Sequence, residues 1–280
     1  MTVVRRTESH LRGVDGLALF RRAWLPEEPR HALVVVHGYA EHSGRYDGFG
    51  AWFAARGFAV HAYDQRGHGR SRGRRCYVRA FREFLDDLDC FLEIVREEHS
   101  EMPITLVGHS MGGLITAAYL VDRRPPIHSA ATSGAGLALR EDISRLRMKM
   151  ALVLRHLLPR LSMGRPLDAD GLSRDPEVVK AYLEDPLVSR GMTTSLAAEL
   201  LGAVPQTAAR AADVAVPLLL LHGEEDPLCP VEGSRAFFDG VAIAGSGLRV
   251  YPKLRHEIFN EPEREQVYQD ILDWLNGLPS

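Results

Sequence analysis

The sequence has little cysteine, and its three cysteines, Cys76, Cys90 and Cys229, are scattered along the chain without the spacing of metal ligands. An odd number of separated cysteines favours reduced thiols over a disulfide framework, as is typical of proteins in an intracellular compartment. Structural zinc sites draw on closely spaced cysteine and histidine ligands. We therefore expect free thiols and no metal site.

Long apolar runs and blocks of one charge are also missing. No stretch approaches the ~18 consecutive apolar residues of a membrane span, and Arg5, Arg6 and Glu8 lie where a signal peptide would have its apolar core. The 34 basic and 37 acidic residues leave a net charge of −3, and the longest basic stretch is the short segment 70–75. These features predict a cytoplasmic protein and give no reason to expect nucleic acid as a partner.

Strand and helix patterns alternate along most of the 280 residues. This alternation predicts an α/β fold, with a mostly parallel central sheet and helices on both faces. The length is near the ~250–300 residue limit of one hydrophobic core, which favours one domain with an insertion. The expected strands are 3–12, 17–24, 33–36, 58–63, 104–107, 127–132, 216–221 and 248–251, and the expected helices are 46–56, 81–98, 113–120, 231–238 and 263–275.

The alternation stops in the segment 137–212, which has helical patterns but no convincing strand. Proline removes a backbone donor and restricts the residue before it, so the prolines here should divide the segment into short helices. They are Pro159, Pro166, Pro176, Pro186 and Pro205. We therefore expect a helical cap at 137–212, inserted into a core formed by 1–136 and 213–280.

One serine lies where a strand should stop and a helix should begin. Ser110 is the centre of Gly-His-Ser-Met-Gly at 108–112, after the apolar run 104–107 and before the small, apolar segment 113–120. A tight strand-to-helix turn exposes such a serine, and glycines on both sides avoid collisions as the chain reverses. The pattern alone is common, so its context has to support a nucleophile.

The rest of a serine triad follows in the order that the α/β-hydrolase fold requires, with acid and then histidine after late strands. Asp226 follows the strand expected at 216–221, and His256 follows the one at 248–251 and is the only histidine C-terminal to Asp226. Glu224 and Glu225 are rival acids, but the Gly-x-x-Asp-Pro pattern favours Asp226. The sequence therefore predicts Ser110 as nucleophile, His256 as general base and acid, and Asp226 as the group that orients the imidazole.

An oxyanion hole should come from two backbone N–H groups. The amide after the nucleophile belongs to Met111, and a second should lie in the loop after the strand at 33–36, where Tyr39 has the right position. His109 lies beside the nucleophile in sequence, and we expect its side chain to point away from the reacting centre.

Three segments resemble the monoacylglycerol lipases and related lysophospholipases. HGYAEHSGRY at 37–46 resembles their oxyanion loop, DQRGHGRS at 64–71 their D-x-x-G-H-G-x-S segment, and GHSMGG at 108–113 their nucleophile elbow. The resemblance extends from the first strands to the last helix and is weakest in the cap. It implies hydrolysis of a fatty acyl ester of glycerol through an acyl-enzyme, with no metal or organic cofactor.

The resemblance also implies an apolar acyl tunnel under the cap. Leu152, Leu157 and Leu158 are candidate lining residues, although apolar stripes on helices more often pack a helix on its core. Glu41 and Arg45 are candidates for the glycerol end, although a buried charge generally needs a partner within the protein, which favours a structural role for them and for His42. Asp64 and His68 are expected to fix the loop after a core strand.

Other activities of this fold stay open. A serine at the elbow disfavours the dehalogenases and epoxide hydrolases, which use aspartate there, whereas carboxylesterases, lysophospholipases, thioesterases and proline-specific aminopeptidases keep it. A hydrolase fold can also serve as a ligand-binding protein without turnover, and the cap's apolar helices could make transient contact with a lipid surface. The sequence is silent on oligomeric state.

Overall fold

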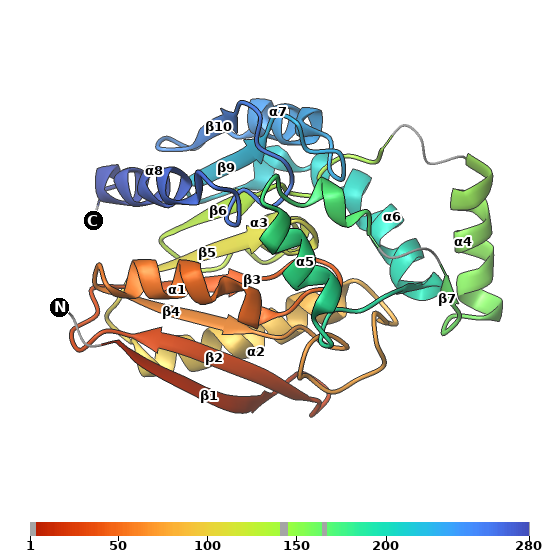
Figure 1. Ribbon diagram of the computed structural model, residues 1–280, viewed down its shortest axis with the longest axis horizontal. Helices are drawn as coiled ribbons and strands as arrows, with labels where there is room; N and C mark the ends of the chain where they lie inside the picture. The colour runs from red at the N-terminus through yellow and green to blue at the C-terminus, as the bar shows by residue number, and fades with distance from the viewer. Residues whose placement is uncertain (1–3, 141–144, 164–166, 280) are drawn as a thin grey trace.

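A computed structural model describes residues 4–140, 145–163 and 167–279 (Figure 1). It contains an eight-stranded sheet of order β1-β2-β4-β3-β5-β6-β9-β10. β2 pairs antiparallel with both of its neighbours, β1 and β4. All the other neighbouring strands pair parallel. The strands are β1 (Arg5–Arg12), β2 (Ala18–Leu25), β3 (His31–Val36), β4 (Phe58–Tyr63), β5 (Ile104–His109), β6 (Ser129–Ser133), β9 (Leu218–Gly223) and β10 (Gly247–Tyr251). The expected mostly parallel α/β sheet is confirmed.

Helices cover both faces of the sheet and create two apolar cores. Successive side chains of a strand point to opposite faces, and in β3 Val34 and Val36 pack in one core while Leu33 and Val35 pack in the other. The first core lies under α2 (Arg82–Glu98), α3 (Met111–Arg123) and α7 (Val231–Gly240), and the second lies under α1 (Asp47–Ala54) and α8 (Arg264–Gly277). Within the described ranges there are also the short 3-10 helices η1 (Ser43–Tyr46), η2 (Ala169–Gly171) and η3 (Ala211–Asp213).

The segment between β6 and β9 is helical, as the sequence predicts. It contains α4 (Arg145–Leu157), α5 (Pro176–Glu184) and α6 (Thr194–Ala208), and Figure 1 shows α4 standing apart from the sheet at one side of the molecule. The expectation of no strand here is wrong in detail, because β7 (Ser162–Met163) and β8 (Met192–Thr193) form a short antiparallel pair. None of the described helices is long and apolar enough to cross a membrane.

Pro205 does not divide the cap, contrary to expectation, because it lies inside α6. The Ala209 amide donates to the Pro205 carbonyl at 3.1 Å, so the helical turn continues past the proline. One face of α6 is buried, including Leu196, Ala203 and Val204. Burial of this face offsets the single backbone bond that proline removes, so tertiary packing overrides local propensity.

Candidate active site

Ser110 lies at the turn between β5 and α3 with a backbone φ of 54° and ψ of −117°, a conformation that is rare for any residue other than glycine. Glycine is required beside it because the chain passes close to other backbone. A Cβ at Gly112 would lie 2.0 Å from the Val36 carbonyl oxygen, and one at Gly108 would lie 2.4 Å from the Gly112 carbonyl oxygen. The expected sharp elbow is therefore present, with strain at the serine.

His256 and Asp226 meet beyond the carboxyl ends of β10 and β9. His256 Nδ1 lies 2.7 Å from Asp226 Oδ2, and both side chains are buried. The other carboxylate oxygen accepts hydrogen bonds from the amides of Leu228 at 2.8 Å and Cys229 at 2.9 Å. Glu224 and Glu225 are exposed, so the carboxylate that pairs with the imidazole is that of Asp226.

The two charged groups stabilise each other's ionised forms. Burial alone raises the pKa of Asp226, but the His256 ring and the hydrogen bonds from His222 and His256 lower it well below its usual range. Burial likewise lowers the pKa of His256, and the Asp226 carboxylate more than offsets this, so the net shift of that pKa is upward. Asp226 is therefore ionised at neutral pH, and it favours the imidazolium that forms when His256 accepts a proton.

Two neighbours of this pair were not recognised in the sequence. His222 Nε2 lies 3.1 Å from Asp226 Oδ2 and 3.0 Å from the Cys229 carbonyl, so it is a second imidazole donor to the carboxylate. Cys229, which looks like an isolated thiol in the sequence, is close enough to Ser110 for the serine to influence the pKa of its thiol. Burial followed by the nearby Asp226 charge raises the pKa of the Cys229 thiol, so it stays neutral beside the serine.

The position of His109 corrects the sequence expectation. Its ring does not point away from the centre but lies 4.8 Å from the His256 ring, centroid to centroid. His109 Nδ1 donates to the Ser133 carbonyl oxygen at 3.0 Å, which turns the ring toward His256. Burial, with the neighbouring His256 second, lowers the pKa of His109 to about 3, so the ring is neutral and packs against His256 without competing for the Asp226 charge.

The loop after β3 is held by the charged residues for which we expected a structural role. The Gly38 amide donates to Glu41 Oε1 at 2.5 Å, and the Tyr46 hydroxyl donates to the same oxygen at 2.8 Å. Arg45 donates to Glu41 at 3.2 Å and to Glu257 at 2.8 Å. These bonds fix the conformation of the segment that contains Tyr39.

Asp64 and His68 also hold this region, as expected. Asp64 Oδ1 accepts hydrogen bonds from the Ser43 amide at 2.8 Å and hydroxyl at 2.5 Å, and its Oδ2 accepts one from the Arg70 amide at 2.7 Å. His68 Nδ1 is bonded to the Arg66 carbonyl at 3.0 Å. Asp64 therefore links the loop after β4 to the loop after β3, whereas the bond of His68 lies within the loop after β4.

Ser110 and His256 line one small cavity of about 10 Å³, together with Tyr39 of the loop after β3. Glu41 and Arg45 also line it, so these two residues face the same cavity as Ser110 and His256 while they hold the loop. The remaining lining residues of the cavity are Gly38, His109, Leu167, Leu172, Tyr182 and Glu257.

The three cap leucines lie elsewhere than the sequence suggests. Leu152 is 44% exposed, Leu157 71% and Leu158 52%. Side chains this exposed neither line an enclosed acyl tunnel nor pack the cap on the core, so both interpretations of these residues are corrected. Helical periodicity shows that the residues share a face, but it does not show what that face contacts.

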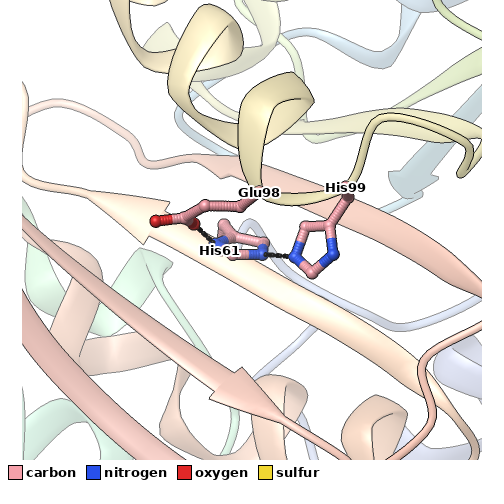
Figure 2. A group of neighbouring side chains, drawn as sticks. All are labelled: His61, Glu98 and His99. Carbon is pink, nitrogen blue, oxygen red and sulfur yellow. Dashed lines mark hydrogen bonds and ion pairs between the residues drawn. The ribbon is translucent and has the colours of Figure 1, made fainter.

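One group of potential metal ligands lies away from this cavity. Figure 2 shows His61 of β4 between Glu98 and His99 at the end of α2. His61 Nε2 lies 2.8 Å from His99 Nε2, whereas Glu98 lies at the other ring nitrogen, 3.9 Å away. Both Glu98 oxygens are already bonded to Arg21. An ion would have to break the imidazole pair and compete with a guanidinium, so we assign no metal to this group.

Comparison with known proteins places the chain in a family. Residues 27–263 match the family model described as serine aminopeptidase, S33. A monoacylglycerol lipase of Mycolicibacterium smegmatis is 42% identical over 96% of this chain and 97% of its own length. The human monoglyceride lipase is 34% identical over 95% of this chain and 89% of its own length.

A solved structure agrees. The monoacylglycerol lipase of Paleococcus ferrophilus superposes with a TM-score of 0.81 at 30% identity, covering 98% of both chains. A soluble variant of the monoglyceride lipase of Saccharomyces cerevisiae, at 22% identity and a TM-score of 0.87, supports the fold. The chain belongs to the monoacylglycerol lipase family of the α/β-hydrolase superfamily.

Proposed function

We propose that this carboxylic ester hydrolase cleaves monoacylglycerols to glycerol and fatty acid, with Ser110, His256 and Asp226 as its catalytic triad. The observation that carries the assignment is the 2.7 Å contact between His256 Nδ1 and Asp226 Oδ2, in a pair whose imidazole shares a cavity with Ser110. The names of the relatives support the substrate class.

The reaction proceeds in two stages. His256 accepts the Ser110 proton as the hydroxyl attacks the ester carbonyl, and it then gives that proton to the departing glycerol oxygen. Water attacks the resulting acyl-enzyme by the same route and releases the fatty acid. Asp226 stays ionised, holds the proton-bearing Nδ1 of His256 in place and stabilises the imidazolium.

The negative charge on the carbonyl oxygen is stabilised by the backbone N–H groups of Tyr39 and Met111. The Met111 amide belongs to the first turn of α3, where amides have no acceptor within the helix. Arg45 and Glu41, which line the cavity, are the polar groups that we propose to contact the glycerol end.

A labelling experiment tests the triad. A fluorophosphonate should label the native protein, and Ser110→Ala should abolish both labelling and ester hydrolysis. The matched control is Ser100→Ala, because Ser100 is exposed and lies outside the cavity, so this variant should behave as wild type. Equal labelling of wild type and Ser110→Ala would overturn the assignment, and a native protein that binds esters without labelling would be a ligand-binding protein.

A substrate panel tests the ester class. Monoacylglycerols should be hydrolysed with the highest kcat/KM among monoacylglycerols, diacylglycerols, triacylglycerols, lysophospholipids and short p-nitrophenyl esters. A higher kcat/KM for lysophospholipids would identify a lysophospholipase. Comparable values across the panel would identify a broad carboxylesterase.

We further propose that residues 137–212 form the cap and that the exposed face of α4 touches lipid surfaces transiently, from the cytoplasm. Support comes from the exposure of Leu152, Leu157 and Leu158, together with Val153 at 58%. An exposed apolar helix face of this kind contributes to binding at a membrane interface.

Flotation with phosphatidylcholine vesicles tests this contact. Leu157→Glu should remove the protein from the lipid fraction. Val14→Glu is the matched control, because Val14 is similarly exposed, at 54%, but lies in the turn between β1 and β2. Equal flotation of Leu157→Glu and wild type, or no flotation of wild type, would reject the proposal.

A further inference from the structure

A cavity of about 640 Å³ lies between the loop after β4 and the chain around β8, and it shares no lining residue with the cavity of Ser110. Three arginines line it: Arg74 and Arg75 come from the loop after β4, and Arg190 comes from the turn before β8. The described residues that line it include no aspartate or glutamate. Ligand-binding cavities have volumes of roughly 300–1,000 Å³, so this one is large enough for a ligand that carries negative charge.

The guanidinium groups at this cavity are held in place without being neutralised. Arg74 Nη2 donates to the Arg160 carbonyl oxygen at 2.8 Å, and Arg190 Nη2 donates to the Leu183 carbonyl oxygen. Neither these two arginines nor Arg75 forms an ion pair with a carboxylate in the described part of the chain. A guanidinium has five N–H donors and a carbonyl oxygen takes one of them, so most of these donors remain for a ligand.

Other arginines of the same loop do have carboxylate partners. Arg66 pairs with Asp87 at 2.6 Å, and Arg70 pairs with Glu8 at 2.8 Å. The whole chain carries a net charge of −3, so an excess of positive charge at one place runs against its overall composition. Like charges that line one cavity repel each other, and an anion bound among them would relieve this repulsion.

A phosphate group suits this cavity best. The planar guanidinium presents its N–H groups in a fork that matches phosphate oxygens, often with two parallel hydrogen bonds. A phosphate also has enough oxygens to accept bonds from more than one of the three arginines. A carboxylate, with its two oxygens, would occupy fewer of these donors.

Exposed leucines next to the cavity indicate where the phosphate comes from. Leu157, Leu158 and Leu161 are 71%, 52% and 43% exposed, and Ser162, the next residue in the chain, lines the cavity. In Figure 1, β7, which begins at Ser162, lies at the same side of the molecule as α4. A soluble phosphate compound would leave these leucines in water. At a membrane surface, the leucines enter the interface while the arginines meet anionic headgroups.

We propose that the cavity of Arg74, Arg75 and Arg190 binds the phosphate of an anionic phospholipid headgroup and gives the protein a preference for negatively charged membrane surfaces. This inference deepens the lipid contact proposed for α4 and rests on it: the leucines supply the apolar contact, and the arginines select the headgroup. Binding forms and breaks no covalent bond. The site takes no part in ester cleavage, so its loss should leave the chemistry at Ser110 unchanged.

Flotation with two kinds of vesicle tests the headgroup site. Wild type should partition more strongly into vesicles of phosphatidylcholine mixed with phosphatidic acid than into vesicles of phosphatidylcholine alone. Each arginine near an anionic surface contributes about fivefold to binding, so Arg75→Gln should lower partitioning into the mixed vesicles about fivefold and Arg75→Gln/Arg190→Gln about 25-fold. Both variants should match wild type on phosphatidylcholine, whose headgroup has no net charge. Added salt should weaken only the extra binding to the mixed vesicles.

Controls separate this site from overall charge, from folding and from the catalytic centre. Arg235→Gln removes one positive charge from an exposed position of α7 that does not line the cavity, and it should partition as wild type does. All arginine variants should keep wild-type fluorophosphonate labelling and hydrolysis of a soluble p-nitrophenyl ester. Calorimetric titration with glycerol 3-phosphate tests for a soluble ligand and should show no saturable binding. If the loss of the bond between Arg190 and Leu183 prevents folding, Arg75→Gln alone still decides.

The outcomes distinguish this inference from the proposed function. Equal partitioning of Arg75→Gln and wild type into the mixed vesicles would overturn the headgroup site. An equal loss in Arg235→Gln would also overturn it, because overall charge would then account for the attraction. Saturable binding of glycerol 3-phosphate that the double variant loses, with flotation unchanged, would identify a soluble ligand instead of a membrane. All three results leave the ester hydrolase intact, whereas labelling that persists in Ser110→Ala overturns the proposed function.

Discussion

The imidazole of His42 and the carboxylate of Asp185 are joined by a 2.8 Å hydrogen bond that crosses from the loop after β3 to the segment between β6 and β9, the proposed cap. His42 Nδ1 accepts the Gly44 amide, so Nε2 is the donor to Asp185. The guanidinium of Arg45 lies 4.8 Å from the centre of the Tyr182 ring and adds a second contact across the same boundary. The loop that contains Tyr39 and the segment that covers it are therefore mechanically linked.

Loss of the His42 contact should loosen the cap. In Asp185→Asn the acceptor opposite His42 Nε2 is weakened, and we expect cleavage of the cap by trypsin under native conditions to become about fivefold faster, the equivalent of about 1 kcal/mol. Asp170→Asn, at an exposed cap aspartate, is the control and should be cleaved at the wild-type rate. Equal rates for Asp185→Asn and wild type would show that this bond does not hold the cap closed.

The pH dependence of hydrolysis should report the His256–Asp226 pair. The imidazole must be neutral to accept the serine proton, and Asp226 raises its pKa, so kcat/KM should fall on the acid side with a midpoint above the ordinary value of about 6.5. Asp226→Asn should move this midpoint to lower pH and reduce kcat by about 10³- to 10⁴-fold. Measured profiles from pH 5 to 9 check both effects, and a flat acid limb in the wild type would contradict the role of His256.

Two glycine-to-alanine substitutions should have opposite effects on stability. Gly112→Ala places a Cβ 2.0 Å from the Val36 carbonyl oxygen, and it should lower the free energy of unfolding by several kcal/mol. Gly202→Ala, inside α6 with no atom within 4 Å of the added carbon, should raise it by up to about 1 kcal/mol. Urea denaturation of both variants gives the comparison. A stable Gly112→Ala would mean that the elbow relaxes more easily than its close contacts indicate.

The buried Glu257 should make the fold sensitive to acid. Burial raises the pKa of this carboxyl, but Arg45 more than offsets this and lowers it to about 2. Because the folded-state pKa lies below the unfolded value of about 4.3, this group's contribution is complete above about pH 4.3 and is lost as the pH falls toward 2.

Glu257→Gln removes that titration. The variant should be less stable than wild type at pH 7, because Arg45 loses one of its two carboxylate partners, but its unfolding free energy should fall less steeply between about pH 4.5 and 2. Glu93→Gln, at an exposed helical position, should follow the wild-type slope. If the unfolding free energies of Glu257→Gln and wild type fall equally steeply with pH, the acid sensitivity comes from groups other than Glu257.

Elements with strong local signals could be predicted from the sequence. The strand at 58–63 has the expected bounds, and the turn at Ser110 follows from small residues between an apolar strand and a helix. The strand expected at 216–221 is displaced by two residues, to Leu218–Gly223, because pairing with β6 and β10, and not apolarity alone, sets where it begins.

Features that depend on packing between distant segments could not be predicted. The contact of His109 with His256 arises because Ser133 of the neighbouring strand turns the His109 ring. His222 lies inside a strand, and its bond to Asp226 depends on the turn that follows. Exposure of Leu157 is decided by how far α4 stands from the sheet, which no spacing within the helix encodes.

The pairing of β6 with β9 has a consequence for how activity appears during synthesis. These neighbouring strands are separated in the chain by residues 134–217, and His256 comes later still. At about 5–20 residues per second, the ~150 residues between Ser110 and His256 take roughly 7–30 s to emerge. With the proposed triad, a nascent chain would carry Ser110 for many seconds before it acquires His256, and a ribosome-bound fragment that ends ahead of β10 should have no esterase activity.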